Sequence, residues 1–211
     1  MKPKIHFTAP YHWINDPNGL IYYKGNYHIF YQHFPYENFW GTMHWGHATT
    51  KDFIHFQHYP IALYPSKIYD RNGCFSGSAI EKDGKLYLYY TAIRYAKENP
   101  EYVHIQYSDD DLIASQALMI SDDGFHFDNK DGKQKIIDVI EDKVLGDVRH
   151  TRDPKVWKMK NGKYALIVGS KVPSETGYCG EVLLYESEDA VHFTYKNRFL
   201  DDKSDRSHVV L

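Results

Sequence analysis

The stretch Thr50-Lys51-Asp52-Phe53-Ile54-His55-Phe56 recurs twice further along the chain, at Ser121 to Phe127 and at Ser187 to Phe193. The three copies share Ser or Thr, then Asp two residues later, then His-Phe, and their first positions lie 71 and 66 residues apart. An Asp in this setting is typical of a turn, because its carboxylate accepts hydrogen bonds from backbone N–H groups just ahead of it. We therefore interpret Asp52, Asp123 and Asp189 as turn residues rather than catalysts.

A hairpin-like segment precedes each copy. The three segments run from Leu20 to Tyr31 around Gly25, from Ala79 to Thr91 around Gly84, and from Val156 to Val168 around Gly162. Each is typical of two strands joined by a Gly-containing turn. A repeat of about four strands is typical of a propeller blade. Helical periodicity is weak, with only modest candidates such as Ile93 to Pro100. We predict an all-β fold of the β-propeller type with three blades.

Three blades are fewer than a closed propeller contains, since propellers typically have about four to eight. The outermost strands would then leave open edges, which stable proteins normally cover. We expect either self-association or a complementing chain at these edges.

Composition limits the remaining possibilities. The chain has 211 residues, 42% of them hydrophobic, which suits one domain or a piece of one. A formal charge of −3 without a basic cluster predicts neither nucleic acid nor a membrane surface as partner. The N-terminus lacks an apolar signal region and no apolar run is long enough to span a membrane, so we expect a cytoplasmic protein. The two cysteines, Cys74 and Cys179, suggest core residues rather than disulfides.

Two aspartates occupy matching positions in the repeat. Asp16 lies nine residues before Gly25, and Asp153 lies nine residues before Gly162. Taken alone, Asp16 before Pro-Asn-Gly would suit a turn, and Asp153 beside Arg152 would suit an ion pair that caps a blade. The matching placement favours instead a pair of carboxylates in a sugar-cleaving pocket.

Four motifs together resemble the family-32 glycoside hydrolases, which include invertases, sucrose-6-phosphate hydrolases and fructanases. They are Trp13 to Gly19, Trp40 to Thr49, Gly73 to Ala79, and Arg152 to Trp157. The resemblance covers nearly all of residues 1–211. It implies a five-bladed propeller whose central funnel holds a fructosyl unit, followed by a C-terminal β-sandwich. On this basis residues 1–211 are expected to form a partial N-terminal catalytic propeller of about three blades, without the fourth and fifth blades and the sandwich.

The resemblance also implies roles for individual residues. Asp16 would be the nucleophile that forms a covalent fructosyl-enzyme, and Asp153 would stabilise the oxocarbenium-like transition state. Arg152 beside Asp153 should favour the charged carboxylate. The residues expected to line the fructose subsite are Asn15, Gln32, Trp40, Phe75, Ser76 and Arg152.

The chain departs from the family in its general acid. The family places a Glu in a Trp-Glu-Cys-Pro-Asp-like motif on the fourth blade, and neither Glu175 nor Glu181 matches it. Loss of a positioned proton donor costs about 10²–10⁴-fold in rate. We therefore expect a β-fructofuranosidase-type retaining hydrolase of terminal β-fructosyl units, with sucrose or sucrose 6-phosphate as substrate, present as a fragment that lacks the acid/base and has little activity alone. The alternatives are a non-catalytic fructoside-binding module and, less favoured by the Trp13 and Arg152 motifs, a propeller glycosidase acting on arabinose polymers.

The 13 histidines raise the question of a metal. His44 and His47 fall in an expected strand rather than on one face of a helix, and no carboxylate nearby completes a site. His55, His126 and His192 recur in the repeat and are expected to pack and hydrogen-bond. No Gly-rich phosphate loop is present. We predict neither a metal nor a cofactor.

Overall fold

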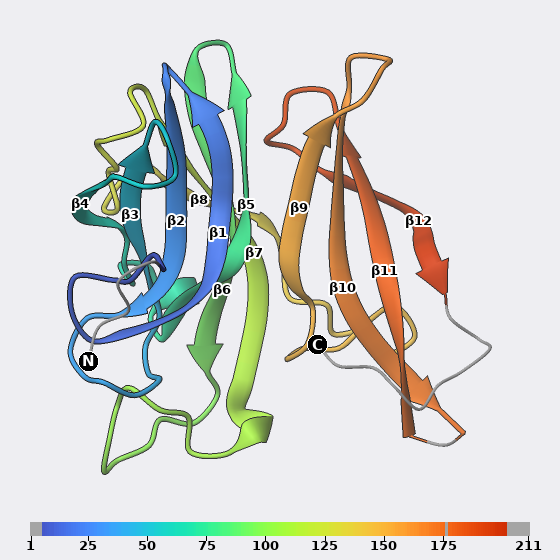
Figure 1. Cartoon of the computed structure of the whole chain (residues 1–211). Helices are drawn as coiled ribbons and strands as arrows, with labels where there is room; N and C mark the ends of the chain where they lie inside the picture. The colour runs from blue at the N-terminus through green and yellow to red at the C-terminus, as the bar shows by residue number, and fades with distance from the viewer. Residues whose placement is uncertain (1–5, 176, 202–211) are drawn as a thin grey trace.

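The computed structural model describes residues 6–175 and 177–201, which form three antiparallel sheets of four strands each (Figure 1). Within these ranges there is no α-helix, and the helical segments are two 3-10 turns, η1 (Ile68–Asp70) and η2 (Asp109–Asp111). The all-β prediction is confirmed. The helical candidate was wrong, because Ile93 to Tyr95 continue a strand in which Ile93 is fully buried.

Each sheet is a meander in which every strand pairs with its neighbours in sequence. We call the sheets blades I, II and III. Blade I contains β1 (Trp13–Tyr23), β2 (Asn26–Phe34), β3 (His44–Thr50) and β4 (Phe56–Leu63). Blade II contains β5 (Gly73–Lys82), β6 (Lys85–Tyr95), β7 (Leu112–Ser121) and β8 (Lys133–Ile137). Blade III contains β9 (Arg152–Lys158), β10 (Tyr164–Ser174), β11 (Gly177–Ser187) and β12 (Thr194–Asp201).

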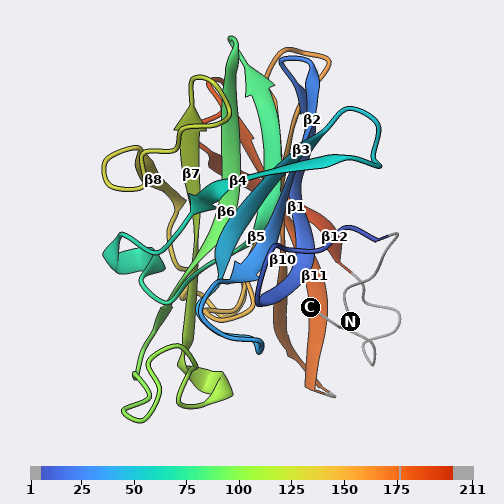
Figure 2. The same cartoon turned by 60° about the vertical axis from the view of Figure 1, so that its left-hand side comes forward.

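The first strands of the three blades lie side by side. β5 contacts β1 on one side and β9 on the other, as Figure 1 shows. The later strands of blades I and II lie further out, which is clearest in the view of Figure 2. This arrangement is that of a partial β-propeller, with β1, β5 and β9 as its inner strands.

The inner strands of blades I and II turn back through two-residue hairpins, as predicted. Lys24-Gly25 and Asp83-Gly84 connect the strands, and both residues of each turn have positive φ, at 46° and 83° in the first and 52° and 76° in the second. This is the type I′ geometry, whose twist matches that of the flanking strands and which favours glycine at its second position. These turns lie at the top of Figure 1.

The sequence motif that recurs three times forms the same turn in each blade, and we call it the turn repeat. In blade I, Asp52 Oδ1 accepts hydrogen bonds from the backbone N–H groups of Ile54 and His55, at 2.9 and 2.8 Å. His55 Nδ1 lies 2.7 Å from Asp52 Oδ2. The same bonds recur at Asp123 and Asp189. The interpretation of these aspartates as turn residues is confirmed.

One detail of the turn repeat differs from expectation, and a second differs between the blades. The imidazoles of His55, His126 and His192 hydrogen-bond as predicted, but they are 87–91% exposed and do not pack in the core. After the second copy, β8 begins only at Lys133, because a tight loop follows in which Gly132 N donates to Asp128 O at 2.8 Å.

Apolar side chains fill the spaces between the blades. Blades I and II enclose residues that include Phe30, Trp45, Leu88 and Met119. Blades II and III enclose another group, which includes Tyr89, Leu118, Val156, Leu166 and Leu183. Both cysteines are buried and unpaired, in agreement with their prediction as core residues. The packing fixes the positions of the three inner strands relative to one another.

Candidate functional site

Each inner strand carries an irregularity at the same level, near the end opposite the hairpin turns. In β1, Ile14 pairs with His33 and Pro17 with Tyr31, so Asn15 and Asp16 together oppose the single residue Gln32. A β-bulge of this kind re-aims side chains and is common next to active sites.

The bulge of β9 places Asp153 in the same way. Arg152 pairs with Gly169 and Lys155 with Ile167, so Asp153 and Pro154 together oppose Val168. Asp153 has a φ of 66°, in the left-handed region that non-glycine residues seldom occupy. In both strands the bulged Asp precedes a proline, which has no N–H to contribute to the ladder.

In β5 the extra residue is Ser76. Phe75 pairs with Thr91 and Gly77 with Tyr90, and nothing opposes Ser76. The backbones approach closely here, since a Cβ added to Gly77 would lie 2.0 Å from Tyr89 O. Only glycine fits after the bulged serine.

The bulges bring residues from blades I and II into contact. Ser76 Oγ donates a hydrogen bond of 2.8 Å to Asp16 Oδ2. Beside it, Trp13 Nε1 donates to Asn15 Oδ1 at 2.7 Å, which fixes the amide of Asn15. The rings of Trp40 and Phe75 meet edge to face, with centroids 5.8 Å apart. Of the residues expected to line the subsite, Phe75 is nearly buried in this contact, with 9% exposure.

Gln32 is also buried, and its amide has a structural contact. Gln32 Nε2 donates to the backbone carbonyl of Cys74 at 3.1 Å. This bond joins β2 to β5 one residue before Phe75. The structure therefore places Gln32 at the junction of the two blades.

A buried hydrogen-bond chain, which the sequence did not reveal, holds the backbone of Asp153. Asp153 N donates to Thr91 Oγ1 at 2.9 Å, and Thr91 Oγ1 donates in turn to Gln116 Oε1 at 2.9 Å. Gln116 Nε2 then donates to Thr151 O at 2.8 Å. The side chains of Thr91 and Gln116 are at most 1% exposed. Blade II thus fixes the segment of blade III that carries the aspartate. No local pattern announces these contacts, which join residues 35 and 62 positions apart.

The charges around Asp153 oppose one another. Removal of water by the surrounding protein raises the pKa of this carboxyl, Arg152 lowers it, and the charge of Asp16 raises it again. The predicted effect of Arg152 is present, but the net shift is upward. The charge of Asp16 reaches Asp153 across β5, which lies between their strands. Both residues are nevertheless partly exposed, so solvent screens these electrostatic effects.

Arg152 itself is oriented by a histidine. Its Nη2 lies 2.8 Å from His150 Nδ1. Burial and then the charge of Arg152 lower the pKa of His150 to about 4. The imidazole is therefore neutral near pH 7, and its Nδ1 accepts the hydrogen bond from the guanidinium.

Two further observations concern metal sites and membrane-spanning helices. Within residues 6–175 and 177–201 no three His, Cys, Asp or Glu side chains are grouped so that they could hold a metal ion. No helix in the same part of the chain is long and apolar enough to cross a membrane.

Comparison with known proteins decides the family. The family model described as "Glycosyl hydrolases family 32 N-terminal domain" matches residues 6–210. The chain belongs to glycoside hydrolase family 32. Three of the four motifs that carry the resemblance contain the bulges of the neighbouring inner strands, and the fourth, Trp40 to Thr49, leads into β3 of blade I.

Relatives in this family act on sugars that contain fructose. A sucrose-6-phosphate hydrolase of Zymomonas mobilis is 40% identical over 206 residues, which cover 96% of this chain and 37% of that protein. A raffinose invertase of Escherichia coli is 42% identical over 87% of this chain and 34% of that protein. The chain therefore spans little more than a third of the length of these relatives.

Solved structures of the family share the fold. A Bombyx mori GH32 β-fructofuranosidase superposes with a TM-score of 0.78 at 33% identity, over 97% of this chain and 39% of the solved one. A mutant of the same Bombyx mori enzyme has been solved in complex with sucrose. The glycoside hydrolase relationship and the partial propeller are thus supported independently by sequence and by structure.

Proposed function

We propose that this family-32 chain supplies the nucleophile and the transition-state stabiliser of a retaining β-fructofuranosidase, with a terminal β-fructosyl unit as substrate. The observation that carries the proposal is the hydrogen bond between Ser76 and Asp16 on two neighbouring bulges. It holds one carboxylate oxygen, and the third bulge carries Asp153 on β9, on the other side of β5.

In this proposal Asp16 attacks the anomeric carbon of the fructosyl unit. Ser76 occupies Oδ2, so we assign the attack to Oδ1. The bond between the anomeric carbon and the leaving oxygen breaks, and that oxygen takes a proton from a general acid. Water then attacks the same carbon, gives up a proton, and releases Asp16 as a carboxylate with overall retention of configuration.

Asp153 would stabilise the positive charge that develops on the sugar ring. Its carboxylate acts only when ionised, which Arg152 favours and the surrounding protein opposes. Asn15, Gln32, Trp40 and Phe75 are proposed to shape the subsite, the last two as aromatic walls.

We further propose that the three blades are the N-terminal part of a five-bladed propeller, with the general acid on the portion that follows. Blade I supports this arrangement, since it exposes large apolar side chains on β1 and on the loop after β3: Leu20 at 60%, Tyr22 at 62% and Phe53 at 58%. Such a patch marks a contact surface. The isolated 211-residue chain is expected to self-associate through it, and static light scattering that shows only monomers at rising concentration would contradict this.

The nucleophile can be tested without the general acid. A nitrophenyl β-fructofuranoside has a leaving group that departs as a stable anion without a proton, so this substrate should fructosylate Asp16 even when no acid is positioned. Intact-mass measurement after an acid quench should show the gain of one fructosyl unit, and peptide mapping should place it on Asp16. Sucrose, whose leaving group needs the proton, should react about 10²–10⁴-fold more slowly than with a complete enzyme.

Matched variants give this experiment its controls. Asp16→Asn keeps the shape of the side chain and should abolish the label, whereas Ser76→Ala should slow its formation. Asp52→Asn, in a turn repeat far from the bulges, should label normally. Sugar binding by the unaltered chain without any label would instead favour the non-catalytic fructoside-binding module.

A further inference from the structure

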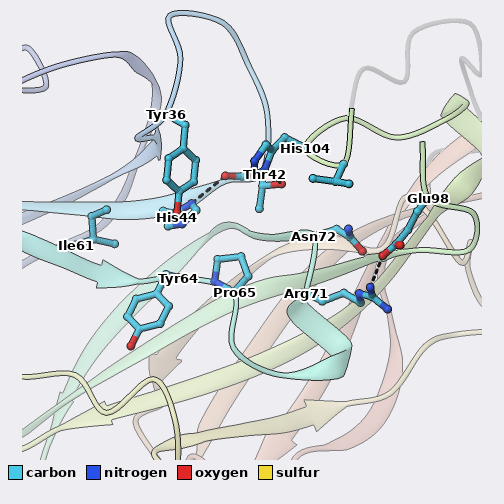
Figure 3. Close-up of a pocket in the computed structure, with 11 residues that line it drawn as sticks. Tyr36, Thr42, His44, Ile61, Tyr64, Pro65, Arg71, Asn72, Glu98 and His104 are labelled. Atoms are coloured by element: carbon cyan, nitrogen blue, oxygen red, sulfur yellow. Dashed lines mark hydrogen bonds and ion pairs between the residues drawn. The ribbon is translucent and has the colours of Figure 1, made fainter. Parts of the chain in front are cut away.

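A separate pocket of about 530 Å³ lies between blades I and II (Figure 3). Its volume is within the range of about 300–1,000 Å³ that is common for small-molecule sites. A backbone contact between the starts of β3 and β5, in which Cys74 N donates to Met43 O at 2.9 Å, separates it from the candidate site. Thr42, His44 and Asn72 line the pocket, whereas Phe75 packs against Trp40 in the candidate site. No role assigned above uses this pocket.

Two buried side chains present fixed hydrogen-bonding groups to the pocket. Asn72, 5% exposed, accepts a bond of 2.8 Å from Tyr95 N through Oδ1, which leaves its Nδ2 as a donor. His44, also 5% exposed, is bonded through Nδ1 to Thr42 O at 2.9 Å. A carbonyl only accepts, so Nδ1 carries the proton and Nε2 of the neutral ring is an acceptor. Asn72 Nδ2 is thus a fixed donor and His44 Nε2 a fixed acceptor, although burial of polar groups is unfavourable unless they find hydrogen-bond partners.

The pocket carries little net charge. Arg71 and Glu98 form an ion pair at one end, as Figure 3 shows. Burial lowers the pKa of His44 to about 4 and also lowers that of His104, so both rings are neutral near pH 7. A free anion would meet no unpaired cation among the lining residues, and a free cation would meet no unpaired carboxylate. These features favour a neutral ligand.

The other walls are apolar and exposed. Tyr36 and Tyr64 line the pocket with 57% and 44% exposure, and Val103 on the loop between β6 and β7 is 57% exposed. Aromatic faces with a polar edge are suited to a ligand that has an apolar face and many hydroxyl groups. A sugar ring has both.

We propose that this pocket is a second carbohydrate-binding site, which takes one neutral hexosyl unit without cleaving it. Asn72 and His44 bind its hydroxyl groups, Tyr36 and Tyr64 contact its apolar face, and the Arg71–Glu98 pair borders the opening. The site stands apart from Asp16 and Asp153 and depends on the proposed function only for the choice of sucrose as the first probe.

The test is a titration of the ¹⁵N-labelled 211-residue chain with sucrose, followed through its backbone amide resonances. Amides of Thr42, Asn72 and His104 report on the pocket, and amides of Asn15, Ser76 and Asp153 report on the candidate site. We expect the resonances of both groups of amides to shift, and to saturate at different sucrose concentrations. Tyr64→Ala should weaken the response of the pocket amides by about tenfold and leave that of the candidate-site amides unchanged. Tyr195→Ala, which removes a 37% exposed tyrosine of β12 in blade III, is the matched control.

The outcomes separate the two proposals. Shifts confined to the candidate site would overturn the second site and leave the proposed function standing. Shifts confined to the pocket would support the second site and count against the proposed function. Pocket amides that respond to inorganic phosphate rather than sucrose would show an anion site and refute the proposal. If Tyr64→Ala alters the whole spectrum, Val103→Arg, which narrows the pocket from an exposed loop position, replaces it, and unchanged sucrose binding in that variant would contradict the proposal.

Discussion

Each end of the blades has a backbone feature that recurs in all three blades: the turn repeat at one end and the inner-strand bulge at the other. At one end, the turn repeat has Asp and His-Phe at the same places in all three blades, with Asp52, Asp123 and Asp189 accepting the same backbone hydrogen bonds. At the other end, the inner strands share a bulge, but its residues are not the same in all three: blades I and III carry Asp16 and Asp153, and blade II carries Ser76. Residues recur where only a backbone shape is required. They diverge where the shared shape aims side chains at one another.

Among these variants, the largest loss of stability and of labelling is expected from a change of Thr91, which supports Asp153 at the bulge end. Thr91→Val keeps the shape of the side chain but leaves the N–H of Asp153 and Oε1 of Gln116 without a partner. We expect a loss of about 1–3 kcal/mol in unfolding free energy and slower fructosyl labelling of Asp16, because Asp153 is released from its position. Chemical denaturation and the labelling rate measure the two effects.

Asp123→Ala is the counterpart at the turn end. It removes an acceptor from an exposed turn and should cost about 1 kcal/mol of stability with no change in labelling. If Thr91→Val and Asp123→Ala slowed labelling equally, the bulge end would have no special role in the reaction, and the comparison would be wrong.

A smaller effect is expected from the fourth position of the turn repeat. Phe53, Gly124 and Ala190 all have positive φ there, at 59°, 81° and 65°. A non-glycine residue in this region costs about 1–2 kcal/mol, partly offset by the greater entropy that glycine loses on folding. Because Ala190 is fully buried, Ala190→Gly also loses the burial of one methyl group, about 0.8 kcal/mol, so its net stabilisation should be well below about 1 kcal/mol.

The converse change gives the control. Gly124→Ala should destabilise, since the new Cβ would also lie 2.9 Å from the ring of Tyr23. Thermal unfolding of the two variants should shift in opposite directions. A lower melting temperature for Ala190→Gly would show that loss of the buried methyl group outweighs the relief of backbone strain.

The smallest effect concerns pH. The pKa of Asp153 is raised in the folded protein, chiefly by loss of water around it. A raised carboxyl pKa adds stability below the unfolded value, which is lost as pH rises through the folded value, so the ionised group destabilises at neutral pH. Asp153→Asn should raise the melting temperature at pH 7, with a difference that disappears below about pH 4. Asparagine also tolerates the positive φ, so a gain that persists in acid would point to the backbone instead.

The sequence predicted features that depend on local pattern. The turn aspartates, the Gly-containing hairpins and the buried cysteines follow from residues close together in the chain, and the structure has them. The inner-strand bulges had a signal in the sequence that was not used for them: the proline after Asp16 was weighed as turn chemistry and the proline after Asp153 was not interpreted, although both fit a bulge. Thr91, Gln116 and Ser76 act through contacts across blades, and nothing near them in the sequence indicates a partner.

The electrostatic prediction for Asp153 was incomplete for a related reason. Arg152 is its neighbour in sequence, and its effect was foreseen. The opposing effects come from the protein packed around the carboxyl and from Asp16, 137 positions away in the chain. Only the fold brings those together.

The meander order of the blades has a consequence for how the chain is made. Because every strand pairs with the strand before it, the backbone hydrogen bonds of a blade need only residues that have already left the ribosome. Contacts between close neighbours in sequence also speed folding. Blade I can therefore complete its sheet before β5 is synthesised, and each later blade can assemble on a finished surface.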